Sequence, residues 1–316
     1  MLYVTTRNNQ ETFTAQRVLN SDRAPDGGFY IPFHDPEFSE QELARLKTVS
    51  FHQRIAEILN RLFQTKLDRW DVSFAIGRTP VKLINLRHHI IMGEFWHNPK
   101  WSFAQMEQSL TQLLCETPEK EPGNWVRIAI RIAVLAAVCL DLVGDERETV
   151  DISAVSGDLL WPISVWYARS WGFPIGNIIV CCNENHNLWD LICHGQMRTD
   201  SVSIQTELPD ADIPIPPDLE RLIYACGGRD EQEKYLDCCC KGERYSASEQ
   251  TLASLREGLY VSVVSSDRMN NTIPGVLRTH NYLLSPGAAL AYAGLLYYRA
   301  KKGTFRSTLV ITEKSP

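Results

Sequence analysis

The chain has 316 residues, of which 44% are hydrophobic and 22% charged, a composition typical of an ordinary globular protein with one large or two modest domains. Its formal net charge of −6 leaves no basic surface of the kind that attracts nucleic acid, and no run of Lys and Arg indicates an anionic membrane. The first ten residues are polar, and the longest apolar run, residues 132–140, is too short to span a bilayer. We therefore expect a cytoplasmic protein that binds neither nucleic acid nor membranes.

The chain contains nine cysteines. An odd number of cysteines in a chain with no export signal favours a reducing compartment and free thiols. Cys181 and Cys182 are adjacent, and residues 238–240 are three cysteines in a row. Neither group has the C-x-x-C spacing that turns two thiolates toward one zinc ion. We expect small buried side chains, a few surface thiols and no metal site.

The first 85 residues are expected to form a small domain. A strand over residues 1–5 precedes a turn-rich loop over residues 24–32, which contains two glycines and two prolines. A break over residues 71–80 follows the helices of this segment, and the pattern after it becomes strand-like. We therefore place the domain boundary near residue 85.

Two helices of this domain have clear start signals. Ser39 with Glu42 and Ser50 with Gln53 form the pattern of a capping box, in which each end of the pair satisfies a backbone N–H of the other. The second helix carries its apolar residues on one face and must pack against another element: Phe51, Ile55, Ile58, Leu59 and Leu62.

Beyond residue 85, strand-like and helix-like segments alternate, which is typical of an α/β sheet with crossover connections. Three expected strands lie at residues 150–153, 178–182 and 307–312. The expected helices run from near Pro162 to Gly172, up to Gly195, and from Ser285 to Gly303; proline favours a helix start and glycine the position just past its end.

Seven segments follow, in the same order, the motifs of one enzyme family. Residues 3–7 resemble its opening Y-x-S-T-R, and residues 24–32 nearly reproduce its turn A-P-D-G-G-L-Y-x-P. Its motif I-N-W-A-R-I has a counterpart at residues 123–128, and residues 154–195 follow its P-S-G-N-F-G, a G-L-P-I step, N-E-N-N and a closing glycine. Residues 213–224 resemble D-I-x-V-S-S-N-F-E-R-L-L-Y, residues 282–289 resemble Y-L-L-D-P-H-T-A, and the last strand, at residues 310–312, resembles the one that ends at T-A-H-P. The chain thus resembles threonine synthase, a fold-type II pyridoxal phosphate enzyme similar to tryptophan synthase β.

The resemblance fails at the residue that holds the cofactor. The family motif H-G-P-T-x-x-F-K-D contains the lysine that forms the Schiff base, and here it corresponds to residues 97–105. Histidine, proline and phenylalanine stay in register, but the lysine position is Ala104 and the aspartate position is Gln105. Because a methyl group cannot form an imine, the resemblance implies no internal aldimine at this position.

Two neighbouring residues leave alternatives open. Lys100 could replace the missing lysine, although it follows Pro99 in the loop before the helix, and we expect its amine to point elsewhere. His97 could act as an acid or base, but without a cofactor a packed or surface histidine is the simpler interpretation. We assign no catalytic residue.

The family's phosphate-binding loop is altered as well. Its P-S-G-N-F-G presents backbone N–H groups at a helix N-terminus. Here Ser156 and Gly157 are retained, while Asp158 replaces the asparagine and Leu160 the second glycine. Two unit charges about 4 Å apart repel by about 4 kcal/mol at an effective dielectric constant near 20, so a carboxylate here opposes a phosphate.

Thr312 matches the threonine that, in the family, hydrogen-bonds the pyridine nitrogen of the cofactor. The residues after it, 313–315, replace A-H-P, and Ser285 and Gly287 replace the aspartate and histidine of D-P-H-T-A. Residues of the motifs that shape the fold are retained, whereas residues that carry out the chemistry in the family are replaced. The resemblance therefore implies a degenerate cofactor site at Ser156, Gly157, Asp158 and Thr312, and we expect no bound cofactor.

The resemblance also implies a shortened fold. The expected architecture is a three-layer α/β scaffold of the fold-type II kind, with a threonine-synthase-type N-terminal domain at residues 1–85 and a truncated α/β domain at residues 86–316. Residues 114–123 bridge a place where the family carries a domain-sized stretch, so part of the smaller layer is expected to be missing. The helix from residue 124 is apolar on every side over residues 132–140 and must be buried all round. The expected cover is a homodimer or a homologous partner chain, and the alternative is that helices already present in the chain have shifted to fill the gap.

Two functions are compatible with these residues. The first is a threonine synthase-like protein that is catalytically inactive and acts as a binding or regulatory homologue. The second is a pyridoxal phosphate-dependent threonine synthase, a lyase that makes threonine from O-phosphohomoserine, using a non-standard lysine or a partner chain. Pyridoxal phosphate is expected only in the second case.

Overall fold

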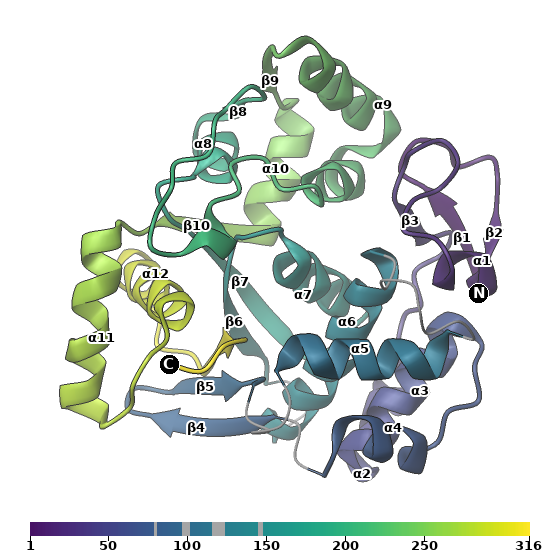
Figure 1. Ribbon diagram of the computed structural model, residues 1–316, viewed down its shortest axis with the longest axis horizontal. Coiled ribbons are helices and arrows are strands. Elements are labelled where there is room, and N and C mark those ends of the chain that lie inside the picture. Colours follow the sequence, from purple (N-terminus) through teal and green to yellow (C-terminus); the bar gives the residue numbers. More distant parts are fainter. Residues whose placement is uncertain (79–80, 97–101, 116–123, 145–147) are drawn as a thin grey trace. The chain divides into compact units, whose positions relative to one another are not determined.

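The computed structural model describes residues 1–78, 81–96, 102–115, 124–144 and 148–316 (Figure 1). The chain has a mixed α/β fold with two compact units, each described by itself below. Unit 1 comprises Met1–Lys82, Phe95–Val150 and Ser164–Gly176, and unit 2 comprises Leu83–Glu94, Asp151–Ile163 and Asn177–Pro316. These units follow the packing of the chain, whereas the boundary near residue 85 follows sequence resemblance, and that boundary stays a prediction.

Unit 1 combines a small antiparallel sheet with a group of helices. The strand order is β2-β1-β3, with β1 at Leu2–Thr5, β2 at Phe13–Thr14 and β3 at Tyr30–Pro32. The helices are α1 (Ala15–Leu19), α2 (Glu40–Thr48), α3 (Phe51–Phe63), α4 (Arg69–Ile76), α5 (Phe103–Leu114) and α6 (Asn124–Leu142). The N-terminal strand and both predicted helices of this segment are therefore present.

The capping signals of α2 and α3 differ in outcome. Ser39 and Glu42 form the complete capping box of α2. Ser50 accepts a hydrogen bond from the backbone N–H of Gln53, as predicted, but the Gln53 amide donates to Glu57 at 3.1 Å instead of returning to the cap. A carboxylate one turn along the helix competes successfully for the glutamine side chain.

Helix α6 is covered by the helices of its own unit. All side chains over residues 132–140 are buried, and α1, α2, α3 and α5 pack around them. Arg54 of α3 donates to the Ala137 carbonyl at 3.0 Å and forms an ion pair with Asp141. Helices of the chain itself therefore cover α6, as the alternative to a partner chain expects, and the burial of α6 gives no reason for a second chain. The dimer itself stays a prediction, and the bridging segment 116–122 lies outside the described residues.

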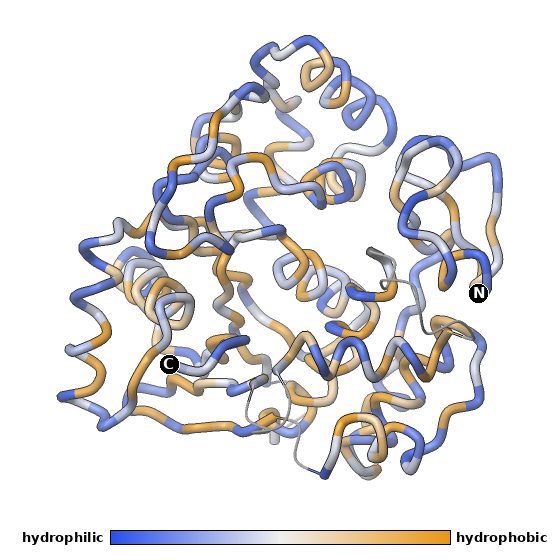
Figure 2. The backbone as a smooth tube through the Cα atoms, in the orientation of Figure 1, coloured by the Kyte–Doolittle hydropathy of each residue, from blue (hydrophilic) through white to orange (hydrophobic). Residues whose placement is uncertain are grey.

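Unit 2 is built on a six-stranded sheet of order β10-β7-β6-β11-β5-β4. Its strands are β4 (Lys82–Leu86), β5 (Ile90–Glu94), β6 (Val150–Val155), β7 (Ile175–Cys182), β10 (Leu259–Val263) and β11 (Thr308–Thr312). β10 pairs with β7, and β11 with both β6 and β5, all in parallel. β6 and β7 are buried along most of their length, and Figure 2 shows hydrophobic residues in both, which is typical of a parallel sheet. The predicted α/β class is confirmed.

The remaining elements of unit 2 connect these strands. They are α8 (Asn187–His194), β8 (Gln196–Arg198), η1 (Pro209–Ala211), α9 (Leu219–Lys241), β9 (Arg244–Ser246), α10 (Glu249–Gly258), α11 (Ser266–His280) and α12 (Pro286–Lys302). Helix α7 (Leu160–Ser170) begins in unit 2, and its residues 164–170 belong to unit 1. The predicted stop at Gly195 and the predicted span from Ser285 to Gly303 are both confirmed. Gly195 and Gly303 adopt the left-handed conformation that ends a helix, and Ser285 caps the start of α12.

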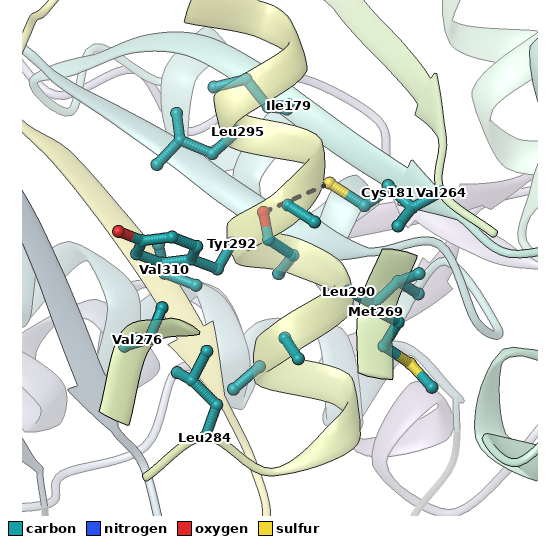
Figure 3. Packing of buried hydrophobic residues seen from close by; sticks show 14 of the residues in the cluster. Ile179, Cys181, Val264, Met269, Val276, Leu284, Leu290, Tyr292, Leu295 and Val310 are labelled. Atoms are coloured by element: carbon teal, nitrogen blue, oxygen red, sulfur yellow. Dashed lines mark hydrogen bonds between the residues drawn. The ribbon is translucent and has the colours of Figure 1, made fainter. Parts of the chain in front are cut away.

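Helix α12 packs on the sheet through a glycine. Leu290, Tyr292 and Leu295 of this helix lie among buried residues of α11 and of the sheet (Figure 3). The Cys181 thiol of β7 donates to the Ala291 carbonyl at 3.6 Å. A Cβ at Gly294 would lie 2.6 Å from the Ser262 hydroxyl and still closer to the Cys181 sulfur, so only glycine allows the helix this close to the sheet.

We predict that Gly294→Ala lowers the free energy of unfolding by about 1–3 kcal/mol, because the added methyl group overpacks the contact between α12 and β7. The matched control is Gly275→Ala in α11, where an added Cβ meets nothing within 4 Å. That control should keep or raise stability by about 0.5–1 kcal/mol, since alanine favours a helix interior. Urea unfolding followed by circular dichroism measures both, and equal stabilities would contradict the packing argument.

Candidate functional site

Parallel strand pairing brings two of the predicted site segments to one edge of the sheet in unit 2. β11 lies beside β6, with Val310 in register with Ser153, so Thr312 at the end of β11 and Ser156 just after β6 lie at the same carboxyl edge. In open α/β sheets ligands bind at this edge. The sequence-predicted loop at 156–158 and Thr312 thus lie at the same edge of the sheet, and their joint role in one site stays a prediction.

The loop after β6 is held tightly by its own backbone. The Ser156 N–H donates to the Cys181 carbonyl at 2.9 Å, and the Ser156 carbonyl accepts from Leu159 N–H at 2.8 Å. Gly157 has φ of 41°, and a Cβ there would lie 3.0 Å from the backbone oxygen of Asp210. The retained glycine is therefore required both by the left-handed backbone and by the close approach of η1.

Asp158 uses the N–H group that an anion would otherwise bind. Its Oδ1 accepts a hydrogen bond from the Leu160 N–H at 3.0 Å, at the first residue of α7. Leu159 and Leu160 are both buried, and Leu159 has a φ of 67°, a strained value for a side chain of this size. The loop thus places its own carboxylate at the helix N-terminus, with leucine side chains packed beneath it.

Thr312 is already engaged with the neighbouring strand. Its hydroxyl donates to the Gly93 carbonyl of β5 at 2.8 Å. Its register partner is Glu94, which is buried and accepts from the Tyr282 hydroxyl at 3.0 Å. Burial, together with the nearby Glu94 carboxylate, raises the pKa of the Tyr282 phenol.

Sequence reasoning missed Glu94 and Tyr282 at this edge. Their separation of 188 positions along the chain gives no local signal, and the pairing of β5 with β11 is what brings Glu94 to Thr312. Lys314, which replaces part of the family's A-H-P, forms an ion pair with Asp210 of η1. Three charged side chains that the motifs did not assign therefore lie around this edge of the sheet: Glu94, Lys314 and Asp210.

Ala104 lies in unit 1, at the second residue of α5, and its side chain is exposed. α5 begins with a complete capping box between Ser102 and Gln105: Ser102 N–H donates to Gln105 Oε1 at 2.8 Å. The residue at the family's aspartate position thus stabilises a helix start. His97 and Lys100 lie outside the described residues.

The buried cysteines carry no reactive thiolate. Burial raises the pKa of the Cys181 thiol to about 11 and that of the Cys182 thiol to about 12. Among the residues that the structure describes, no three His, Cys, Asp or Glu side chains are grouped so that they could hold a metal ion. Within the same residues, no helix combines the length and the apolar character needed to cross a membrane.

The comparisons with known sequences agree with the motifs. The family model described as threonine synthase N terminus matches residues 2–79. Threonine synthase of Pseudomonas aeruginosa is 26% identical over 169 residues, which cover 53% of this chain and 36% of that protein. Human threonine synthase-like 1 is 25% identical over 176 residues, which cover 53% of this chain and 24% of that protein. The matched regions thus span less than half of either relative.

Solved structures match the whole fold. The pyridoxal phosphate-bound threonine synthase of Brucella melitensis has a TM-score of 0.86 and 19% identity, covering 100% of this chain and 89% of that chain. Yeast threonine synthase has a TM-score of 0.84 and 16% identity, covering 100% and 87%. The fold is that of the fold-type II pyridoxal phosphate enzymes. The N-terminal match over residues 2–79, the sequence relatives and the fold together relate this chain to the threonine synthases.

We predict that Asp158→Ala lowers the free energy of unfolding by about 1 kcal/mol, because the Leu160 N–H loses its acceptor. Asp158→Asn is the matched control, since its Oδ1 can still accept the same hydrogen bond and it restores the residue of the family motif. Chemical denaturation of the two variants makes the comparison. If asparagine destabilised the protein as much as alanine, the carboxylate charge rather than the hydrogen bond would be responsible.

Proposed function

We propose that this chain is a threonine synthase-like protein that has lost the parent reaction and acts as a binding or regulatory homologue. The observation that carries the proposal is Ala104 at the Schiff-base position, because no side chain there can form an imine with pyridoxal phosphate. Its exposure at the start of α5 adds to this, since a Schiff-base lysine works in an enclosed site.

The described residues do not fit the phosphate of this cofactor. The Leu159 and Leu160 N–H groups already donate to Ser156 and Asp158, so a phosphate would have to displace both bonds. It would also lie near the Asp158 carboxylate, with a repulsion of about 4 kcal/mol per pair of unit charges at about 4 Å. Both effects favour a site that does not hold the cofactor.

A binding role leaves the partner open. We propose as the partner a second copy of the chain or a homologous chain in the cytoplasm. The need to cover α6 no longer supports this proposal, because helices of its own unit bury it. The relation to the threonine synthases supports a role linked to an intact relative, since homologous subunits share the surfaces that assemble them.

The alternative is a working pyridoxal phosphate-dependent threonine synthase that makes threonine from O-phosphohomoserine. The observation in its favour is the fold, which covers 100% of this chain in the comparison with a pyridoxal phosphate-bound threonine synthase. It requires a lysine from elsewhere, and Lys100 is the nearest in sequence to the missing one.

We expect no internal aldimine when the purified protein is mixed with pyridoxal phosphate. An internal aldimine is yellow, and borohydride reduction would attach the cofactor to one lysine that peptide mass spectrometry can identify. Reduction of a single lysine, together with rescue of a threonine auxotroph by this chain alone, would support the alternative instead. Diffuse labelling of several surface lysines would not.

We also expect Ala104→Lys combined with Gln105→Asp to leave O-phosphohomoserine unconverted. The double change restores the motif residues but not the anion site, which keeps Asp158 and Leu160, and positioning of the substrate would remain poor. The assay measures phosphate release, with the same double variant carrying Asp158→Asn and Leu160→Gly as the comparison. Turnover by the first variant would mean that the altered loop costs little.

A further inference from the structure

Helix α4 displays two large aromatic side chains to solvent. Trp70 is 58% exposed and Phe74 is 87% exposed, and their spacing of four residues places them on one face. Val72 and Ile76, on the opposite face, are buried within unit 1. One face of the helix therefore packs within unit 1. The other face carries a pair of large aromatic side chains, a residue type that contributes much of the binding energy at protein interfaces.

The acidic residues of α4 are turned to its own backbone. Asp68 accepts from the N–H groups of Trp70 at 2.7 Å and Asp71 at 3.0 Å, and Asp71 accepts from the Asp68 N–H at 2.8 Å. This capping box occupies both carboxylates at the helix N-terminus.

The basic residues around the aromatic pair are exposed. Lys66, Arg69 and Arg78 form no ion pair with a carboxylate in the described part of the chain, whereas Arg45 and Arg61 on the neighbouring helices do. The Arg69 guanidinium lies 4.5 Å from the centroid of the Trp70 ring. Residues 66–78 carry these three basic side chains and the two carboxylates of Asp68 and Asp71, so the local net charge is +1 in a protein whose net charge is −6.

Two other occupants of this face fit the charges less well. If two copies of α4 packed antiparallel about a two-fold axis, the segment before the helix would lie at the same end of the contact as the segment after the helix of the second copy. Lys66 precedes the helix and Arg78 follows it, so like charges would come to the same end. An anionic membrane would attract these three basic residues, but it would repel a chain of net charge −6.

We propose that the exposed face of α4 binds an acidic amphipathic segment of a partner protein, whose apolar side chains cover Trp70 and Phe74 while its carboxylates pair with the flanking basic residues. Amphipathic helices bind in this way, through apolar anchors spaced three or four residues apart. The proposal is independent of whether the chain retains catalysis.

Peptide display tests this proposal. A library of random 16-residue peptides is selected on the immobilised full chain, with counter-selection on the Trp70→Ala/Phe74→Ala variant. The expected winners carry Leu, Phe or Trp at helical spacing among Asp and Glu. Synthetic copies should bind the wild-type chain at least about tenfold more tightly than the double variant by calorimetry, and more weakly at high salt.

Phe305→Ala is the control, because this aromatic side chain is 66% exposed in unit 2 and should not affect peptide binding. Circular dichroism checks that the variants are folded, which is expected since the changed side chains face solvent. Winners without an acidic bias, or equal affinity for the double variant, would overturn the proposal. So would self-association or binding to phosphatidylserine vesicles that the double variant abolishes, because a second copy or a membrane would then be the occupant.

Discussion

The parallel pairing of β11 with β6 on one side and β5 on the other is the interaction on which unit 2 depends. The last strand of the chain lies between two strands that come much earlier, and it aligns their carboxyl ends. Through this register the loop after β6, the end of β11 and Glu94 reach one edge of the sheet. Helix α12 precedes β11 and packs closely on the sheet because residue 294 is a glycine, so the helix and strand are held in place together.

At that edge the site satisfies its own hydrogen bonds. Asp158 accepts from the first N–H of α7, the Thr312 hydroxyl donates to Gly93, and Glu94 accepts from Tyr282. A polar group in such a site either binds a ligand or binds the protein, because an unpaired buried polar group costs free energy. The same backbone that presents an anion site in the family motif is here occupied by side chains of the chain itself, and this local exchange fits the proposed loss of the parent reaction without any change of fold.

In unit 1 the chain likewise satisfies its own packing needs. α6 is apolar on every side over residues 132–140, so it needs cover on every side, which a partner chain could supply. The chain instead surrounds it with its own helices, and two buried arginines secure the contacts: Arg54 binds the Ala137 carbonyl, and Arg131 pairs with Glu107 of α5. The two most exposed of the large apolar side chains described in unit 1 lie elsewhere, on α4, where this pair of aromatic rings is the better indication of an interface.

Local chemistry in the sequence determined much of this protein. Interactions within a few residues set the helix starts at Ser39 and Ser285 and the helix ends at Gly195 and Gly303. The alternation of strand-like and helix-like segments indicated the α/β class, and the identity of residue 104 alone shows that no imine can form there. Only the tertiary structure decided that the Gln53 amide turns to Glu57, that Glu94 lies beside Thr312, and that helices of unit 1 pack around α6. Those outcomes depend on strand register and on helix packing between residues far apart in the chain, and such long-range contacts leave no pattern in a single sequence.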